Sequence, residues 1–414
     1  MKILFLTIGS LKTIESHEIY PDLLRRFRDN GHTVYTVSPY EKRTGLKTEL
    51  RNDNGVDMLH VRIGNITKCG LIEKGISTLR IESQFLAAIK KYFDNIKFDL
   101  ILYSTPPITF AKVVKYVKKR DNAKSYLLLK DIFPQNAVDL GIMRKSGLKG
   151  ILYRYFRHKE KKLYAMSDYI GCMSEANVEY VLRHNPEIPR EIVEVCPNAV
   201  DIIDTSVDEI TRSEIRAKYG IPSDKKVFVY GGNLGRPQGI PHLMKCLLAE
   251  RNNPDAFFLI VGSGTEYKKL ETFVAENDIP NMKLMSKMPK EDYDKMVGAC
   301  DVGMIFLDHR FTIPNFPSRL LAYMQAKLPV LAVTDPNTDV GEVCVNGGFG
   351  TWCEANDTSL FSNKVAEMLG ADLREMGERG YQYLLDHYTA QQEYEIIMAR
   401  MKHKGGTHVP IQSH

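Results

Sequence analysis

A glycine-rich turn near the middle of the chain constrains the fold more than any other feature of the sequence. The segment from Val227 to Met244 reads VFVYGGNLGRPQGIPHLM, which predicts a hydrophobic strand, a turn with four glycines and the start of a helix. Such a turn directs free backbone N–H groups and the positive end of a helix dipole at one point, which favours an anion. Because a nucleotide-binding unit that begins there leaves half the chain before it, the turn predicts two α/β units in tandem.

The residue types in the turn suit a phosphate group. Glycine lets the backbone approach a ligand where a Cβ atom would collide, and Arg236 adds a planar cation that we expect to act in catalysis. The alternative is that the glycines only make a tight connection between strand and helix. We favour phosphate binding, and we expect four residues of the turn to contact the donor of that phosphate: Gly232, Asn233, Gly235 and Gln238.

The rest of the chain alternates short apolar runs with longer amphipathic runs, which is typical of parallel sheets covered by helices. In the first half the pattern predicts strands at 2–7, 33–38, 58–63, 99–103, 125–129, 169–173 and 192–196. In the second half it predicts strands at 227–230, 257–261, 282–285, 302–306 and 329–333. The predicted fold class is α/β, with two Rossmann-like domains that face each other across a cleft.

The predicted domain boundary lies in the polar segment 197–226, which separates the two series of strands. We expect residues 1–200 to form the first domain and residues 201–385 to form the second. Residues 386–414 should form a helix that returns to the first domain, followed by the frayed tail KGGTHVPIQSH.

Composition indicates a protein of a reducing compartment. The seven cysteines are scattered and form no CxxC pair, which argues against a disulfide framework or a zinc site. The N-terminal run MKILFLTIGS suits a first strand better than a signal peptide, and no apolar run approaches the ~20 residues that cross a bilayer. The net charge of +5 is too small to indicate nucleic acid by itself. We therefore expect a cytoplasmic protein.

In parallel α/β sheets ligands bind beyond the carboxyl ends of the strands, so residues just after strands are the candidates. Lys130 and Asp131 follow the apolar run SYLLL, and we expect both to act in catalysis, with Asp131 acting as a base or orienting a substrate hydroxyl. The alternative is that Asp131 caps the next turn. Ser104 follows another strand of the first half, and we assign it to the acceptor side of the cleft.

The second half offers further candidates for binding the donor. Gly262 lies in a second glycine turn, although a plain tight turn is an equal alternative. In FTIPNFPSRLLAYMQ two prolines stiffen a loop that enters a helix, where Ser318 can cap the helix and Arg319 can hold a diphosphate or a ribose. Asp335 and Asp339 belong either to a ligand loop or to an Asx-type turn. No other metal-ligand residue types accompany these carboxylates, so we expect no metal.

A basic segment with interleaved aromatic residues occupies 143–164, with the sequence MRKSGLKGILYRYFRHKEKKLY. Basic, aromatic and apolar residues together suit an anionic membrane surface. The alternative is a solvated helix face with its aromatic rings packed inward. We favour the membrane surface, so the protein is expected to be peripheral at the inner face of the plasma membrane.

Taken together, these segments resemble the retaining bacterial glycosyltransferases of the GT-B fold, family 4 type, which assemble capsule, O-antigen or exopolysaccharide. The resemblance covers nearly the whole chain and rests on landmarks in the expected order, among them ILYSTPPITFAKVV, LLLKDIFPQNAVDLG, YIGCMSEANVEYV, VEVCPNAVD, FLIVGSGTEYKKLE, MPKEDYDKMVGACDVGMIFL and FPSRLLAYMQAKLPVLAV. It implies transfer of a sugar from a nucleoside-diphosphate donor, with UDP as the favoured nucleotide and with neither metal nor cofactor. It also implies a polyprenyl-diphosphate-linked saccharide as the acceptor.

The sequence departs from the family pattern at several positions. The family's phosphate-binding Arg and Lys are replaced by Asn233 and Gln238, and its two glutamates by Pro314 and Ala322. The turn after the first strand is poor in glycine, and we assign Glu15 and His17 to the acceptor there.

Two other function classes remain open. A nucleotide-sugar 2-epimerase would have the same fold, and the missing glutamates are consistent with a catalytically silent binding or partner subunit.

Overall fold

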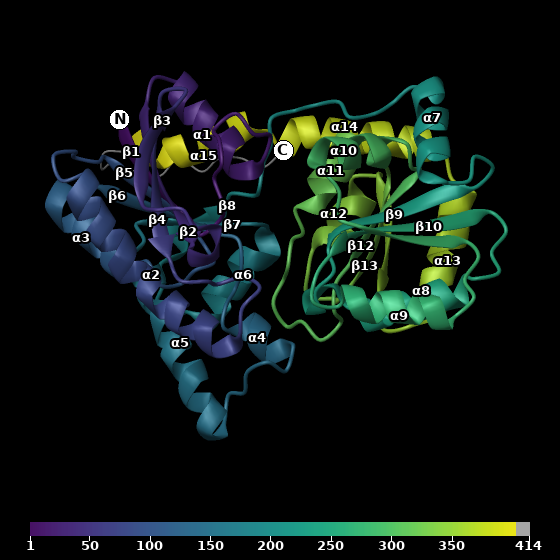
Figure 1. Ribbon diagram of the computed structural model, residues 1–414, viewed down its shortest axis with the longest axis horizontal. Helices are drawn as coiled ribbons and strands as arrows, with labels where there is room; N and C mark the ends of the chain where they lie inside the picture. The colour runs from purple at the N-terminus through teal and green to yellow at the C-terminus, as the bar shows by residue number, and fades with distance from the viewer. Residues whose placement is uncertain (403–414) are drawn as a thin grey trace.

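The computed structural model describes residues 1–402, apart from the side chains of Leu71, Ile72, Leu148 and Lys149. Two separate sheets, parallel apart from one antiparallel edge strand in the first, lie side by side, and each is covered by helices on both faces (Figure 1). This arrangement confirms the predicted α/β class with two facing Rossmann-like domains. The predicted frayed tail, 404–414, lies outside the described residues.

The first domain contains an eight-stranded sheet in the order β3-β4-β2-β1-β5-β6-β7-β8. Its strands are β1 Lys2–Leu6, β2 Thr33–Glu41, β3 Glu49–Asp53, β4 Val56–Ile63, β5 Leu100–Ser104, β6 Lys124–Leu129, β7 Tyr169–Cys172 and β8 Val193–Val195. All pairs are parallel except β3 with β4, a hairpin that the sequence pattern did not predict. Strand β3 reads ELRND and is largely exposed, so it lacks the apolar alternation that identifies a strand.

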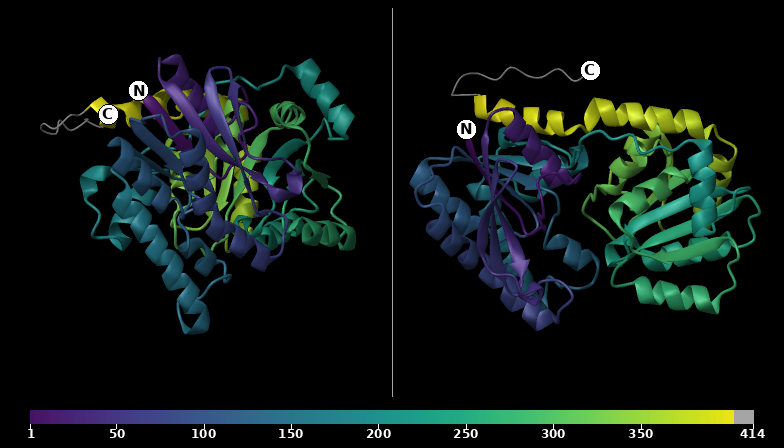
Figure 2. Two further views of the ribbon diagram at one scale, coloured as in Figure 1. Left: turned by 60° about the vertical axis from the view of Figure 1, so that its left-hand side comes forward. Right: turned by 45° about the horizontal axis from the view of Figure 1, so that its top comes forward.

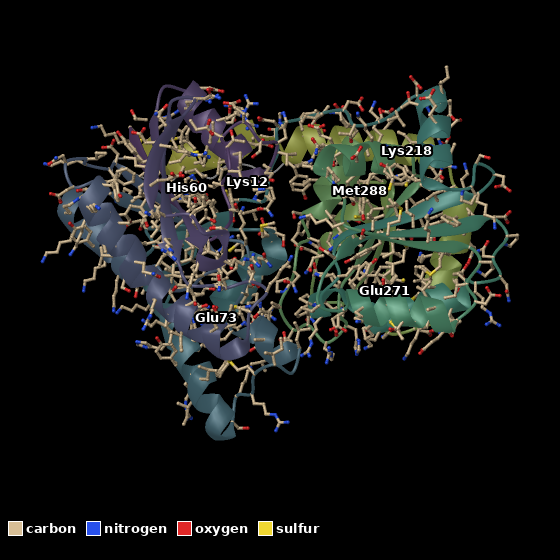
Figure 3. All side chains as sticks on the ribbon, viewed as in Figure 1. Lys12, His60, Glu73, Lys218, Glu271 and Met288 are labelled. Carbon is tan, nitrogen blue, oxygen red and sulfur yellow. The ribbon has the colours of Figure 1, made fainter. Side chains whose placement is uncertain are left out.

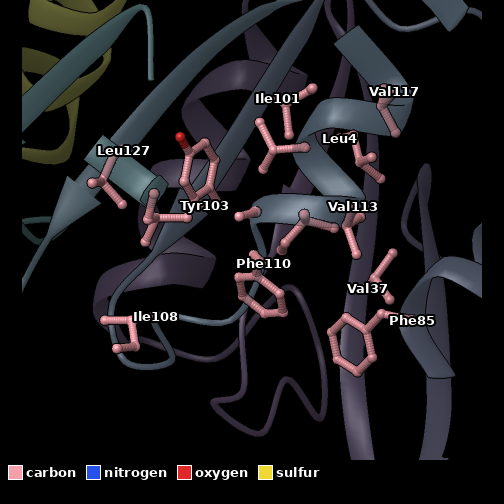
Figure 4. Packing of buried hydrophobic residues seen from close by; sticks show 14 of the residues in the cluster. Leu4, Val37, Phe85, Ile101, Tyr103, Ile108, Phe110, Val113, Val117 and Leu127 are labelled. Atoms are coloured by element: carbon pink, nitrogen blue, oxygen red, sulfur yellow. The ribbon is translucent and has the colours of Figure 1, made fainter. Parts of the chain in front are cut away.

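Helices cover both faces of this sheet and bury its apolar side chains. They are α1 Ile19–Asp29, α2 Leu71–Tyr92, α3 Ala111–Asp121, α4 Gln135–Asp139, α5 Gly147–Met166 and α6 Glu175–His184. Figure 4 shows the larger core cluster, in which Leu4 and Val37 of the sheet pack with Phe85 of α2 and Val113 of α3. This burial fixes the strand ends, and therefore the loops that follow them, at one edge of the domain.

The second domain contains a six-stranded parallel sheet in the order β11-β10-β9-β12-β13-β14. Its strands are β9 Lys226–Asn233, β10 Ala256–Ser263, β11 Met282–Ser286, β12 Val302–Phe306, β13 Val330–Thr334 and β14 Gly350–Glu354. Its helices are α7 Glu209–Tyr219, α8 Ile240–Ala249, α9 Tyr267–Glu276, α10 Lys290–Gly298, α11 Arg319–Gln325, α12 Val340–Asn346, α13 Thr358–Leu369 and α14 Leu373–His387. The glycine-rich turn follows β9, a strand in the middle of the sheet, so neighbouring strand ends surround it.

The chain crosses between the domains twice, and the two crossings lie against each other. The N–H of Val200 donates to the carbonyl oxygen of Tyr388 at 3.0 Å, and the N–H of Ala390 donates to that of Val200 at 2.9 Å. After the second crossing, α15 (Ala390–Lys402) packs on α1 through Ile397 and Met398, as predicted for the returning helix. Figure 2 shows α14 and α15 running in line along one side of both domains.

Candidate functional site

The central turn forms the predicted strand–turn–helix unit. Gly232 and Gly239 have φ angles of 109° and 57°, which side chains other than glycine rarely adopt. A Cβ atom on Gly239 would lie 3.2 Å from the Cα atom of Asp308, so glycine also permits the contact with the end of β12. The Oε1 atom of Gln238 accepts from the N–H of Gly235 at 3.1 Å and from Nδ2 of Asn233 at 3.2 Å. Asn233 and Gln238 therefore hold the turn in shape.

The neighbouring loop after β10 supports the turn from one side. The N–H of Leu234 donates to the carbonyl oxygen of Ser263 at 3.0 Å, and the N–H of Glu266 donates to that of Leu234 at 2.9 Å. A Cβ atom on Gly262 would lie 2.0 Å from the Gly232 carbonyl oxygen, which only glycine tolerates. The role of Gly262 in binding the donor stays a prediction, since its observed role is this close packing.

Arg236 lies where both domains meet. Its side chain is 59% exposed, and its Nε atom is 3.8 Å from Oε1 of Glu266. It lines a cavity of about 240 Å³ together with Lys269 and Arg310 of the second domain and Leu140 of the first. The guanidinium is therefore accessible to a ligand that enters the cleft.

Arg319 lies beneath the turn, among tyrosine side chains. Its guanidinium carbon is 4.3 Å from the ring centroid of Tyr230, and the Tyr230 hydroxyl donates to the carbonyl oxygen of Asn233 at 2.9 Å. The Nη1 atom is buried and has no hydrogen-bond partner in the described part of the chain. An unpaired buried donor is costly, so this atom is a candidate for contact with a ligand. Ser318 has helical backbone angles and makes no capping bond, so the predicted cap is wrong.

The carboxylates of the loop from Asp335 to Asp339 make hydrogen bonds within their own turn and to the first domain. Asp335 is fully buried, and its Oδ1 atom accepts from the N–H groups of Asn337 at 2.9 Å and Thr338 at 3.2 Å. Burial raises the pKa of Asp335 to about 6. Asp339 reaches the first domain, where its Oδ2 atom accepts from the N–H of Ala176 at 3.0 Å. The Asx-type turn is therefore present at Asp335. Oδ2 of Asp335 and Oδ1 of Asp339 are buried and have no partner among the described residues, so a donor-binding role for both carboxylates stays a prediction.

In the first domain, Asp131 lies on the side that faces the second domain. Its two carboxylate oxygens accept from Nδ2 of Asn136 at 2.8 and 3.0 Å, and burial raises the pKa of Asp131 to about 6. The hydroxyl of Thr105 accepts from the N–H of Asp131 at 3.2 Å. The next residue, Ile132, packs against Phe311 of the second domain, so Asp131 is beside the interdomain contact.

Lys130 does not join Asp131 in the cleft. Its Nζ atom lies 3.3 Å from Oε1 of Glu393 and 3.3 Å from the carbonyl oxygen of Cys196, with only 8% of its side chain exposed. Burial raises the pKa of Glu393 to about 7, and Lys130 opposes this rise. Because the ammonium group is held in this buried pair with α15, the prediction of a catalytic Lys130 is corrected to a structural role.

The three predicted acceptor residues are not brought together. Ser104 is buried, and its hydroxyl is 3.3 Å from that of Thr7, so it is not accessible to an acceptor. Glu15 accepts from Nη1 of Arg28 at 2.8 Å and from Nδ2 of Asn54 at 3.1 Å. His17 is exposed. An acceptor role therefore stays a prediction for Glu15 and His17 and is wrong for Ser104.

The two domains also touch each other directly, through contacts that were not predicted from the sequence. The Asp139 carboxylate accepts from the backbone N–H of Thr312 at 2.9 Å and from its hydroxyl at 3.0 Å. Nδ2 of Asn177 donates to the carbonyl oxygen of Pro314. An apolar cluster from both domains accompanies these bonds: Ile132, Leu140, Phe311 and Ile313. The loop 308–318 has no periodic pattern in its sequence that would identify its partner across a cleft.

One group of metal-ligand residue types lies at the first crossing. His17, Asp22 and Asp201 place one ligand atom each within 4.8 Å of the others. Arginine cations already occupy these carboxylates, because Nη2 of Arg25 is 2.7 Å from Asp201 and also bonds Asp22, and Arg26 bonds Asp201. The chemistry of this group is that of an ion-pair network at the crossing.

Two facing Rossmann-like domains, with a glycine turn at the strand ends of the second and a cleft between them, define the GT-B fold. Among solved structures, sucrose-phosphate synthase from Thermosynechococcus elongatus matches with a TM-score of 0.73 and 15% identity, over 97% of this chain and 98% of that one. Anabaena HepE, solved in complex with UDP and glucose, matches with a TM-score of 0.70 and 14% identity, over 97% and 99%. These likenesses show the fold.

Comparison of sequences identifies the family of the second domain. Residues 211–383 match the model of the family described as Glycosyl transferases group 1, so the chain carries a domain of that family. The probable glycosyltransferase WbjE of Pseudomonas aeruginosa is 24% identical over 324 residues, 78% of this chain and 78% of that protein. The putative colanic acid biosynthesis glycosyl transferase WcaI of Escherichia coli (strain K12) is 22% identical over 257 residues, 60% of each chain. Within residues 1–402, apart from the few side chains not described, no helix is both long and apolar enough to span a membrane.

Proposed function

We propose that this protein transfers a sugar from a nucleoside-diphosphate donor, with UDP as the favoured nucleotide, to a hydroxyl of a growing surface polysaccharide. The observation that carries the proposal is the exposed Arg236 beside a glycine turn, at a cavity lined by both domains. The group 1 family domain supports a glycosyltransferase, and the relative named for colanic acid biosynthesis, WcaI, supports the class of product. HepE, solved with UDP and glucose, supports the choice of nucleotide.

The principal chemical demand of this reaction is negative charge on the departing diphosphate. Arg236 and Lys269 line the cavity, and the turn backbone and the N-terminus of α8 lie next to them. Donors fixed in advance around developing charge supply a large part of the rate in such sites. We propose that these groups stabilise the leaving diphosphate without a metal ion, in a reaction that retains the configuration of the sugar.

Arg319 offers a replacement for the missing family glutamates. Position 314 is a proline whose carbonyl oxygen is engaged by Asn177, and position 322 is an alanine in α11, so neither side chain can bind a ribose. The buried Nη1 atom of Arg319 has no partner among the described residues and lies under the turn. We propose that it donates to the donor nucleotide, at its ribose or its α-phosphate.

On the acceptor side, Asp131 is the carboxylate best placed to orient an attacking hydroxyl. It is half-buried next to the interdomain contact, and its carboxylate is held by Asn136. We propose a polyprenyl-diphosphate-linked saccharide as the acceptor, which would place the reaction at the inner face of the plasma membrane. Glu15 and His17 are the exposed residues of the first domain proposed to contact it.

A two-stage experiment tests the proposal. A thermal-shift screen of UDP-, GDP- and CMP-sugars identifies the donor, because a ligand that binds the native state raises its melting temperature. Transfer of labelled sugar to a lipid extract then measures turnover with the donor found. Replacement of Arg236 by alanine should lower turnover by about 10²-fold, whereas alanine at Lys268, an exposed α9 lysine, should leave it unchanged.

Each remaining function class gives a different result. An epimerised nucleotide sugar formed without acceptor would identify an epimerase. Binding of a nucleotide sugar without release of sugar for any acceptor would identify a silent subunit, and in both cases the proposed transferase activity is wrong.

A further inference from the structure

The outer helices of the first domain carry most of the positive charge of the protein. Helices α2, α3 and α5 contain fifteen Lys and Arg residues against four Asp and Glu, a net charge of +11. The whole chain has a net charge of only +5, so the remainder is negative by 6. Three of the four acids have buried side chains, namely Glu82, Asp121 and Glu160, which leaves Glu73 as the exposed one (Figure 3).

These three helices form one continuous face. Helix α3 packs against both α2 and α5, and Figure 1 shows all three on the side of the first domain that is turned away from the second. Exposed cations are present on each helix, for example Arg80, Lys115 and Lys162. The positive field of this face is therefore directed outward, away from the cleft and the proposed donor site.

The N-terminal half of α5 protrudes from this face and exposes apolar side chains. Ile142, just before the helix, and Ile151, Leu152 and Tyr155 on it are each between 41% and 57% exposed. The C-terminal half of the same helix is anchored, since Leu163 is fully buried in the core. The ring of Phe156 packs on Phe133 with centroids 5.1 Å apart. The apolar end is thus continuous with a helix that is anchored in the core of the domain.

The apolar and the basic side chains of α5 are separated along the helix axis by about the distance that separates the acyl chains of a bilayer from its charged surface. Ile151 and Lys162 are 11 residues apart in the sequence, which is about 16 Å along a helix. Amphipathic helices bury their apolar side chains roughly 5–10 Å into the boundary between headgroups and acyl chains. If the apolar end enters to that depth, the exposed cations Arg144, Lys145 and Arg154 reach the headgroups with their long side chains. Lys162 then faces the anionic surface above them.

We infer that this face, the helices α2, α3 and α5 with the apolar end of α5, docks on a bilayer that contains anionic lipids. The exposed apolar side chains favour a lipid surface over a nucleic acid or an anionic glycan. Those polyanions offer no apolar environment in which the side chains could be buried. The inference deepens the proposed function by naming the surface that holds its acceptor. It depends on residues remote from the proposed donor site, so the two can fail separately.

Binding to vesicles tests the inference with the full-length protein. Phosphatidylcholine vesicles with and without phosphatidylglycerol are sedimented, and the bound fraction is measured at low and high salt. We expect binding only with phosphatidylglycerol and a loss of binding as salt rises, since screening weakens attraction between exposed charges. No nucleotide sugar is present, so a failure of the transfer reaction does not affect the readout.

Two double variants separate the electrostatic and apolar contributions. Arg154→Gln with Lys162→Gln should weaken binding about 30-fold, because each cation near the membrane contributes a factor of roughly five. Ile151→Ser with Leu152→Ser should weaken binding at least about tenfold and leave its salt dependence intact. The matched controls on the second domain, Lys268→Gln with Arg374→Gln and Ile210→Ser with Val345→Ser, remove exposed residues of the same kinds and should bind as wild type.

Tryptophan fluorescence gives a second readout of insertion. The chain has a single tryptophan, Trp352 in β14 of the second domain, so a Leu152→Trp variant adds one probe at the end of α5. We expect its emission to shift to shorter wavelength with phosphatidylglycerol vesicles, while wild-type emission stays constant.

Three results would overturn the inference: equal binding to both vesicle types, α5 variants that bind like wild type, or equally tight binding of RNA that does not depend on Ile151 and Leu152.

Discussion

Replacing Asp339 with alanine should favour the open form of the cleft. Its carboxylate caps α6 of the first domain from the second domain, through the N–H of Ala176 at 3.0 Å. Ser174, the residue at the N-cap position of α6, makes no capping bond of its own. Because the cap crosses the interface, any separation of the domains leaves this helix terminus without it.

The loss of free energy expected for Asp339→Ala is the sum of two contributions, the capping hydrogen bond and the negative charge at the helix N-terminus. Loss of an N-cap hydrogen bond costs about 1 kcal/mol. Loss of a negative charge at a helix N-terminus costs roughly 0.3–1 kcal/mol more. The sum, about 1.5 kcal/mol, shifts the ratio of closed to open molecules by roughly tenfold toward open. Asp339→Asn keeps an oxygen acceptor and loses the charge, so it should shift the ratio by a smaller factor.

Small-angle X-ray scattering measures the outcome as the radius of gyration, and a donor titration measures it as affinity. Asp339→Ala should increase the radius and weaken donor binding. The matched control is Asp357→Ala, which removes a cap of the same kind within the second domain, where Asp357 accepts from the N–H of Ser359 at 2.8 Å. It should lower the melting temperature without changing the radius. Equal radii for Asp339→Ala and Asp357→Ala would refute the reasoning.

Four further predictions concern Asp131, Lys130 and Gly264. Asp131 has a pKa near 6, so transfer should fall as pH drops through 6, and Asp131→Asn should abolish that limb of the pH–rate profile. The same raised pKa means that unfolding free energy falls as pH rises from about 4 to 6 in urea titrations, and this slope should vanish in Asp131→Asn. Lys130→Met should cost about 3–5 kcal/mol in urea unfolding by leaving Glu393 buried and unpaired, and Lys130→Met with Glu393→Leu should recover most of it. Gly264→Ala should impair donor binding, because its Cβ atom would lie 2.2 Å from the Leu234 carbonyl oxygen, whereas Gly370→Ala, with no atom nearer than 3.8 Å, should be tolerated. Donor titration that found Gly264→Ala unimpaired, or a flat pH–rate profile in wild type, would contradict these assignments.

Much of the fold was predictable because its signals are local. A buried parallel strand is a continuous apolar run, and the predicted bounds of 302–306 and 125–129 coincide with β12 or fall within one residue of β6. Strands β3 and β14 were not predicted because neither contains a run of apolar residues: β3 reads ELRND and is largely exposed, and β14 reads GTWCE with only its second and fourth residues buried. Position at a sheet edge is not sufficient to hide a strand, since β8 and β11 are also edge strands and were predicted.

The candidate site was less predictable, because a residue's type and its position after a strand do not determine its partner. Three of the candidates, Asp131, Asp335 and Lys130, follow strands, and from the sequence each was expected to act on a ligand in the cleft. The structure leaves only Asp131 at the interdomain contact, since Lys130 finds Glu393 on α15, 263 residues away in the chain. Asp335 is retained by its own turn, within three residues.

For the same reason, a missing family residue does not by itself indicate loss of function. The structure has to show whether another residue takes its place. The absent glutamates at positions 314 and 322 would remove a ribose ligand if nothing replaced them. In this chain the α11 helix instead begins with Arg319, whose buried Nη1 atom is unpaired among the described residues and lies under the donor turn. In a silent subunit the buried, unpaired Nη1 donor of Arg319 would be destabilising with no ligand to compensate for it, and a neutral side chain at this position would remove that penalty. The cost is understandable if a ligand completes the hydrogen bonding of Arg319, and this favours a working donor site over a relic of one.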